Sequence, residues 1–301
     1  MSTTTTTRPR GADTAHRPFT TLARLEGRRM LRHPAPWIGI LLWLAANYAA
    51  LASAPSWSSA QYQGLQSSAA FLAAGVSIAA AYAAGRDRLR LAEDAPMRAE
   101  DRAAARLVGG LGLVALVAVV VAVGALWLRW TGGVAMGAEP GRTLHAHFTL
   151  PELLHPVALA AFAVAAGAAA ARLLRHPLAG SIAVSVLWFV AGPAYWTLNG
   201  PVLRLFAPLM VQPYNIEVAP AATDPLTLPS TWLLEGPGPF QPYWARLVIV
   251  PELGAWHDLY LVAVTLLAAA VALPGRYRRP LLAAGAVLAV VTVLLQARVS
   301  P

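Results

Sequence analysis

The chain contains no cysteine, and all 23 of its basic residues are arginine, so lysine is absent as well. Without cysteine it has no disulfide bonds and no thiolate chemistry. Without lysine it has neither the lysine of a phosphate-binding P-loop nor one that forms a Schiff base with a cofactor. We therefore predict that the chain is not an enzyme and holds no cofactor, and that any ATP hydrolysis takes place on another polypeptide.

Charged residues are scarce in the chain. Only 12% of the 301 residues are charged, whereas 57% are hydrophobic. A soluble domain carries about 25% charged residues, roughly twice the share found here. The apolar runs are long enough for six or seven transmembrane helices of about 20 residues each. We predict an all-α fold, a polytopic membrane helix bundle.

The predicted bundle occupies residues 35–301, after a disordered cytoplasmic tail at 1–18 and an amphipathic interfacial helix at 19–34. Prolines are frequent between 199 and 258 and exclude a continuous helix there. We predict a long outer loop at 199–255, whose short apolar pieces dip part way into the membrane or pack on the rim of the bundle. The predicted transmembrane helices lie near 37–54, 64–85, 107–128, 153–171, 178–198, 256–273 and 281–297.

Arginine is distributed unevenly over the connections between these spans. With the N-terminus in the cytoplasm, 18 arginines fall in cytoplasmic segments and five in external ones, while the acidic residues divide seven and seven. Basic residues, rather than acidic ones, orient membrane proteins. We predict a cytoplasmic N-terminus, a location in the cytoplasmic membrane, and an odd number of spans. The arginines flank apolar runs, so the net charge of +9 is not taken as a sign of nucleic-acid binding.

The most highly charged connection is residues 86–106, which we call the charge island. It separates two runs without any charged residue, 69–85 and 107–128. A soluble core would not bracket charges in this way, but a cytoplasmic loop of a membrane protein would. Asp94 before Pro96 predicts the start of a helix that runs through Arg106 into the next span.

The charged side chains of the island are candidates for contact with a cytoplasmic partner protein. The alternative for each of them is a role as an orientation signal with solvated counter-charges. The candidates are Arg86, Asp87, Arg88, Arg90, Glu93, Asp94, Arg98, Glu100, Asp101 and Arg102.

No ionisable residue is expected inside a predicted span, where it would be a functional hypothesis by default. The seven histidines are all predicted to fall in loops or at span edges. His145, His147 and His155 lie near one another in the sequence but lack a strong metal-binding spacing. We therefore predict no metal site.

Further polar residues near the spans are predicted to have structural roles. Glu252, His257 and Asp258 cluster before the sixth span and are expected to be solvated interface residues. Mild polar side chains within the spans are expected to bridge helices. These are Asn47, Ser77, Ser181, Ser185, Thr265 and Thr292.

Three segments in the first 130 residues carry a family resemblance. The segment RLEGRRMLRHP (24–34) leads into the first span, the polar turn Gln61-Tyr62-Gln63 leads into the second, and LAEDAPMRAEDR (91–102) lies in the charge island. In layout and local character they resemble the permease subunits of type 2 ABC exporters, especially those of actinobacterial antibiotic-resistance and export systems. Six spans are usual in that family, so a seventh departs from its pattern.

The resemblance implies that two permeases, identical or paired, form the pathway and that each binds a separate cytoplasmic ATPase. It also implies a connecting helix at the N-terminus, a coupling helix in the charge island, and partly inserted outer helices between spans five and six. The expected function is that of the permease subunit of an ATP-driven exporter. The alternatives are a non-transport scaffold or assembly factor of a cell-envelope complex, and a membrane enzyme acting on lipid-linked substrates through Glu152, Glu252 and Asp258.

Overall fold

The computed structural model describes a large part of the chain. The described residues are 13–52, 68–86, 97–133, 147–174, 178–197, 215–218, 233–234 and 246–299. The predicted tail up to residue 12 lies outside them, as does most of the predicted outer loop. Five of the island candidates also lie outside the described residues, namely Asp87, Arg88, Arg90, Glu93 and Asp94.

Helices form at the interfacial segment and at every predicted span. They are α1 (Asp13–Leu31), α2 (Pro34–Ala52), α4 (Ala69–Gly85), α5 (Ala99–Trp130), α6 (Leu150–Leu173), α7 (Ala179–Thr197), α9 (Pro251–Ala272) and α10 (Arg278–Val299), with a 3-10 turn η4 (Gly275–Tyr277) before α10.

Among the residues that the structure describes, four helices are long and apolar enough to cross a membrane: α5, α6, α9 and α10 with its preceding turn. α4 and the first half of α7 are apolar but shorter. The predicted fold class is confirmed, since the chain is a membrane helix bundle. The number of crossings stays a prediction.

Local signals explain where several helices begin. The backbone N–H of Thr149 donates to Glu152 Oε2 at 2.7 Å, which closes a capping box at the start of α6. α9 begins at Pro251, five residues before the predicted span, because proline is favoured in the first turn of a helix. α1 begins at Asp13, inside the segment predicted to be a tail.

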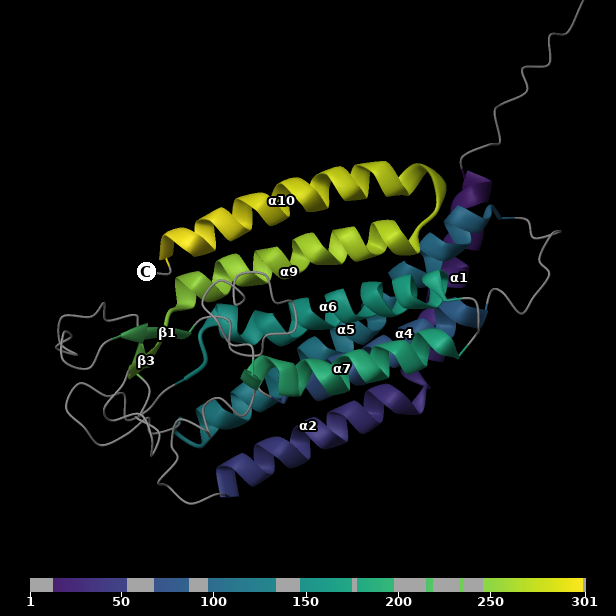
Figure 1. The fold of residues 1–301 in the computed structure, drawn as a ribbon. Coiled ribbons are helices and arrows are strands. Elements are labelled where there is room, and N and C mark those ends of the chain that lie inside the picture. Colours follow the sequence, from purple (N-terminus) through teal and green to yellow (C-terminus); the bar gives the residue numbers. More distant parts are fainter. Residues whose placement is uncertain are drawn as a thin grey trace, which may run out of the picture.

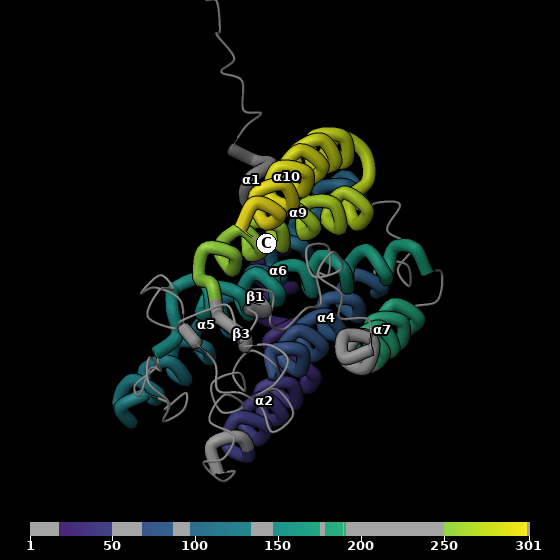
Figure 2. The backbone as a smooth tube through the Cα atoms, turned by 60° about the vertical axis from the view of Figure 1, so that its left-hand side comes forward, coloured from purple at the N-terminus to yellow at the C-terminus, as the bar shows by residue number. Residues whose placement is uncertain are grey.

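The helices pack around α6. This helix contacts α4, α5, α7 and α9, whereas α10 packs on α9, α2 on α4, and α1 on α5. Figure 1 shows the result as a stack of nearly side-by-side helices with α10 at one edge and α2 at the other. The view in Figure 2 shows the same order, with α6 between the α9–α10 hairpin and α4.

Small side chains allow the central helices to approach closely. A Cβ at Gly167 of α6 would collide with the backbone carbonyl of Ser77 on α4. A Cβ at Gly75 of α4 would lie 2.5 Å from the Ala35 carbonyl oxygen of α2. Close contact between small residues is a usual way to pack membrane helices, because lipid offers no hydrophobic driving force between them.

Three of the mild polar residues bridge helices, as predicted. Asn47 Nδ2 donates to Ser68 Oγ at 2.8 Å and joins α2 to the start of α4. Trp188 Nε1 of α7 donates to Ser77 Oγ of α4 at 3.0 Å, and Ser181 Oγ lies 3.5 Å from the Ile78 carbonyl oxygen. The other three donate to carbonyls of their own helices: Ser185, Thr265 and Thr292.

The connections alternate between the two ends of the bundle. Figure 1 shows α1, the start of α5, and the turn between α9 and α10 at one end, and the C-terminus with β1 and β3 at the other. We call the first of these the arginine-rich end, because most of the described arginines lie there. These are Arg24, Arg28, Arg29, Arg32, Arg86, Arg98, Arg102, Arg106, Arg172, Arg276, Arg278 and Arg279.

A small antiparallel sheet lies at the opposite end. Its strands are β1 (Asn215–Val218), β2 (Leu233–Leu234) and β3 (Arg246–Ile249), in the order β1-β3-β2. β3 leads directly into α9. Residues 246–249 thus form a strand and not the outer helix that the resemblance implies, because the β-branched Val248 and Ile249 favour a strand. Insertion of this piece into the membrane, or packing on the rim, stays a prediction.

Candidate functional site

The second half of the charge island opens α5. Arg98 has an extended backbone (φ −58°, ψ 146°), and the helix begins at the next residue. An unbroken helix from Asp94 through Arg106 is therefore wrong, because Arg98 is extended. The predicted helix through Arg106 into the apolar span is confirmed from Ala99 onward. Glu100 and Asp101 lie in the first turn, where negative charge stabilises a helix N-terminus.

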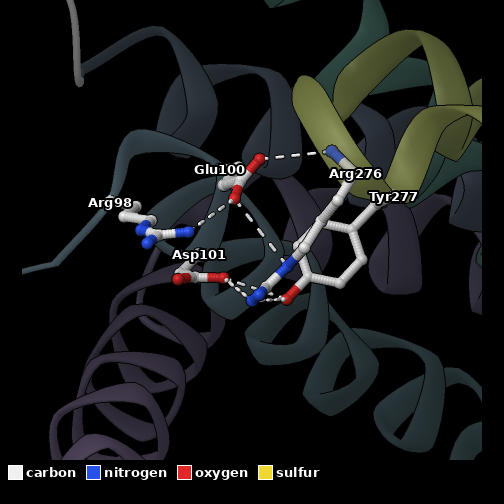
Figure 3. A network of polar contacts seen from close by, with 5 residues as sticks. All are labelled: Arg98, Glu100, Asp101, Arg276 and Tyr277. Carbon is white, nitrogen blue, oxygen red and sulfur yellow. Dashed lines mark hydrogen bonds and ion pairs between the residues drawn. The ribbon is translucent and has the colours of Figure 1, made fainter.

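These two carboxylates bind the connection between α9 and α10 (Figure 3). Arg276 donates from Nη2 to Asp101 Oδ1 at 2.6 Å and from its backbone N–H to Glu100 Oε2 at 3.2 Å. The Tyr277 hydroxyl donates to the same Asp101 oxygen at 2.9 Å, and Arg276 Nη2 lies 2.8 Å from the hydroxyl oxygen. We call Glu100, Asp101, Arg276 and Tyr277 the turn clamp.

The turn clamp was not predicted from the sequence. Sequence reasoning places Arg276 among the orientation signals and does not single out Tyr277. The sequence contained a weak signal for this contact. Two connections that are predicted to lie on the same side of the membrane carry opposite charges. Asp101 and Arg276 are 175 positions apart, and only the packing of the α9–α10 hairpin brings them together.

Gly275 shapes the turn with a positive φ of +67°, and a Cβ there would meet the Glu100 carboxylate. Gly275→Ala is expected to destabilise the protein by about 1–3 kcal/mol, because a residue with a Cβ is strained in this backbone region. Thermal unfolding in detergent measures the loss. Gly132→Ala is the matched control, since Gly132 has φ +91° and open space around it and so reports backbone strain alone. Equal losses would mean that contact with Glu100 contributes nothing.

The first end of the charge island is anchored as well. Arg86 Nη2, just after α4, lies 3.8 Å from Glu26 Oε1 on α1, and Arg29 Nη1 donates to the same oxygen at 3.0 Å. Glu26 is buried, and the Arg86 guanidinium carbon lies 6.0 Å from the centre of the Tyr82 ring. α1 and the end of α4 are thereby joined.

Arg98 is the described candidate that faces solvent. Its side chain is 76% exposed, and its Nη1 lies 3.9 Å from Glu100 Oε1. Arg102 Nη1, in contrast, donates to the Met97 carbonyl oxygen at 2.6 Å. The structure thus brings the two described acidic candidates, Glu100 and Asp101, into the turn clamp and leaves Arg98 directed outward.

A second group of polar side chains lies buried between α6, α9 and α10, away from the arginine-rich end. His155 Nδ1 lies 3.2 Å from Asp258 Oδ1, and His257 Nδ1 lies 2.8 Å from Gln296 Oε1. The centroids of the two histidine rings are 5.9 Å apart. We call His155, His257, Asp258 and Gln296 the buried polar cluster, since each is at most 8% exposed.

This cluster corrects two predictions. His155 and His257 lie within helices and not at their edges, and Asp258 is not solvated. The early start of α9 is the reason, because it places residues 257 and 258 about two turns inside the helix. Asp258 Oδ2 and His257 Nε2 have no hydrogen-bond partner within the part of the chain that the structure describes. Glu252, in the first turn of α9, is exposed.

The described residues contain no group of three or more His, Cys, Asp or Glu side chains placed to hold a metal ion. His145 lies outside the described residues, and His147 is exposed. His155, the third member of the weighed histidine group, points instead to Asp258.

The chain matches no protein-family model and no curated protein. The resemblance to type 2 ABC exporter permeases therefore stays a prediction that rests on the layout of the first 130 residues. The apolar helices show a coarser class: the chain is an integral membrane protein built as a helix bundle.

Proposed function

We propose that the chain is the permease subunit of an ATP-driven exporter in the cytoplasmic membrane, driven by a separate ATPase subunit. The observation that carries the proposal is that both ends of the charge island are anchored to other helices. Arg86 connects α4 to α1, and Asp101 connects α5 to the α9–α10 turn through Arg276. A partner that moves the island would therefore move α4 and α5 together with these neighbours, as in rigid-body switching.

The missing lysine and the exposed side chains of the chain indicate which partners an exporter subunit of this kind would need. The absence of lysine excludes a P-loop, so nucleotide hydrolysis belongs to the ATPase. Arg98 lies at the start of α5 with its guanidinium exposed, and guanidinium groups pair well with carboxylates on a partner surface. Large apolar side chains are exposed along α2 and α10. These faces are available to the bilayer and to a second permease, identical or paired.

The geometry argues against two of the three carboxylates considered for a membrane enzyme, and leaves Glu252 as the exposed one. Glu152 is 1% exposed and caps α6, and Asp258 is paired with His155 inside the bundle. A carboxylate acting as a general acid or base must reach the substrate. A scaffold protein remains the other alternative, and it differs from an exporter subunit in having no ATPase partner.

Arg98→Glu is expected to reduce co-purification of the chain with a tagged ATPase from a neighbouring gene by about tenfold or more, because reversal places like charges at the contact. ATP-dependent transport is the second readout. Arg129→Glu is the matched control, because Arg129 is exposed at the opposite end of the same helix. Asp101 is unsuitable as a probe, since its reversal also breaks the turn clamp.

Normal assembly of Arg98→Glu would contradict the proposed docking site. The lack of cysteine allows an independent check of orientation with a single introduced thiol. Labelling of Arg98→Cys from outside the cell by an impermeant reagent would place the charge island on the external side and exclude a cytoplasmic ATPase.

A further inference from the structure

The buried polar cluster lies near the end of the bundle that carries the small sheet. Asp258, His155 and Gln296 are each no more than seven residues from the end of their helix on this side. At a rise of 1.5 Å per residue, they lie within roughly 10 Å of the helix ends. Water at this end of the bundle is therefore the nearest source of a ligand for the cluster.

Few other titratable or charged side chains lie near the cluster on the three helices that form it. These are Glu152 of α6, Glu252 and Tyr260 of α9, and Arg298 of α10. The Glu152 carboxylate accepts hydrogen bonds from Thr149, and the Tyr260 ring packs 5.7 Å from the ring of His257, centroid to centroid. Glu252 and Arg298 are exposed. Among these residues, Asp258 is thus the buried carboxyl group that contacts a histidine.

Two atoms of the cluster lack a hydrogen-bond donor. Asp258 Oδ1 lies 3.2 Å from His155 Nδ1, but Asp258 Oδ2 is buried without a partner among the described residues. Gln296 Oε1 can only accept, so His257 Nδ1 carries the hydrogen of their 2.8 Å bond. His257 Nε2 is then a bare acceptor in the neutral ring, and it is also buried and without a described partner. Because both atoms are acceptors, the species that the cluster lacks is one that supplies hydrogen.

We propose that the buried polar cluster is a proton-binding site of the bundle, with Asp258 as the residue that gains and loses the proton. A hydronium ion transfers its proton to Asp258 Oδ2 and leaves as water, while Oδ1 keeps its hydrogen bond from His155. Release reverses the step and returns a negative charge to the contact between α6 and α9. Ionisable residues inside membrane spans are functional hypotheses by default, and proton relays are built from Asp, Glu and His.

The surroundings favour a proton over a larger ligand. Each member of the cluster is at most 8% exposed, and the described residues place no three metal-ligating side chains together. A protein site for a metal ion normally has at least three such ligands. The inference depends on the packing of α9 against α6 and not on any ATPase, so it can hold or fail separately from the proposed exporter function.

Infrared difference spectroscopy of the full-length chain in lipid tests the proposal. Spectra are compared between about pH 8 and pH 5, where exposed aspartates stay largely ionised. A C=O band of a protonated carboxylic acid is expected to appear on acidification and to be absent in Asp258→Asn. Wild-type protein grown with 13C-labelled aspartate gives the same assignment without a substitution, because the isotope shifts the band of an aspartate and not that of a glutamate.

Two further variants separate the cluster from carboxyl groups at the interface. His155→Leu is expected to shift the midpoint pH of the band by about one unit or more, because a hydrogen bond to a carboxylate changes its proton affinity. Glu252→Gln is the matched control, since Glu252 is an exposed carboxylate on the same helix, and it should leave both the band and its midpoint unchanged.

Several outcomes would overturn the inference. A band that persists in Asp258→Asn, or that does not shift with labelled aspartate, would assign the proton to another residue. A band of constant height over the whole pH range, or no band at all, would show a carboxyl group that does not exchange its proton. An unmoved midpoint in His155→Leu would separate Asp258 from the cluster. A change in the band on addition of EDTA would identify a metal ion as the ligand instead.

Discussion

His155→Leu is expected to destabilise the protein by about 1–3 kcal/mol, because it leaves the buried Asp258 carboxyl group without its hydrogen bond to His155. Asp258 is 8% exposed, and its Oδ2 has no hydrogen-bond partner among the described residues even with His155 present. Leucine has a volume close to that of histidine, so the loss reflects electrostatics more than a cavity. Thermal or denaturant unfolding in detergent measures the change.

A second substitution separates the charge effect from lost packing. Asp258→Asn in the His155→Leu background replaces the carboxylate by a neutral amide and is expected to recover at least about 1 kcal/mol, a coupling within the usual range for residues in contact. Asp258→Asn alone should cost less than His155→Leu, because no buried charge remains. If the double variant is no more stable than His155→Leu, the Asp258 carboxyl group does not depend on His155 and the interpretation of the cluster fails.

Gly167→Ala is expected to destabilise the protein toward the upper end of the about 1–3 kcal/mol typical of overpacked cores. The added Cβ would collide with the Ser77 carbonyl and lie 3.1 Å from the Ala81 backbone nitrogen. Both are backbone atoms of α4 and cannot turn aside as a side chain can. Ser77 Oγ also accepts the hydrogen bond from Trp188, so displacing this turn of α4 disturbs the contact with α7 as well.

Gly112→Ala is the matched control for this prediction. Gly112 is also a helical glycine, but a Cβ there meets only Leu31 Cδ1 at 3.7 Å, an ordinary contact. Alanine at such a position should be neutral or stabilise the helix by about 0.5–1 kcal/mol. The measurement is again the unfolding temperature in detergent, together with the fraction of protein that elutes as a single species. A Gly167→Ala variant as stable as the Gly112→Ala variant would show that α4 and α6 do not touch at this point.

The residue pattern is sufficient to predict the fold class and the position of each long helix. Both depend on the summed hydrophobicity of about 20 neighbouring residues, because an apolar helix of about that length spans a bilayer. The uneven placement of arginine can also be read from the sequence. It predicts that the α4–α5, α6–α7 and α9–α10 connections lie at the same end of the bundle. Helix starts such as the capping box at Thr149 and Glu152 are local as well.

Contacts between distant residues follow from the packing of the helices and are not present in any local pattern. Asp101 meets Arg276, and His155 meets Asp258, only because α9 lies against α6 and the α9–α10 turn reaches the start of α5. The burial of Asp258 has the same origin: hydropathy places it at the edge of a span, whereas the neighbouring helices α6 and α10 exclude water from it. Local sequence thus defines where the helices form. The tertiary packing decides which polar groups are paired, exposed or buried, because these contacts depend on which helices become neighbours.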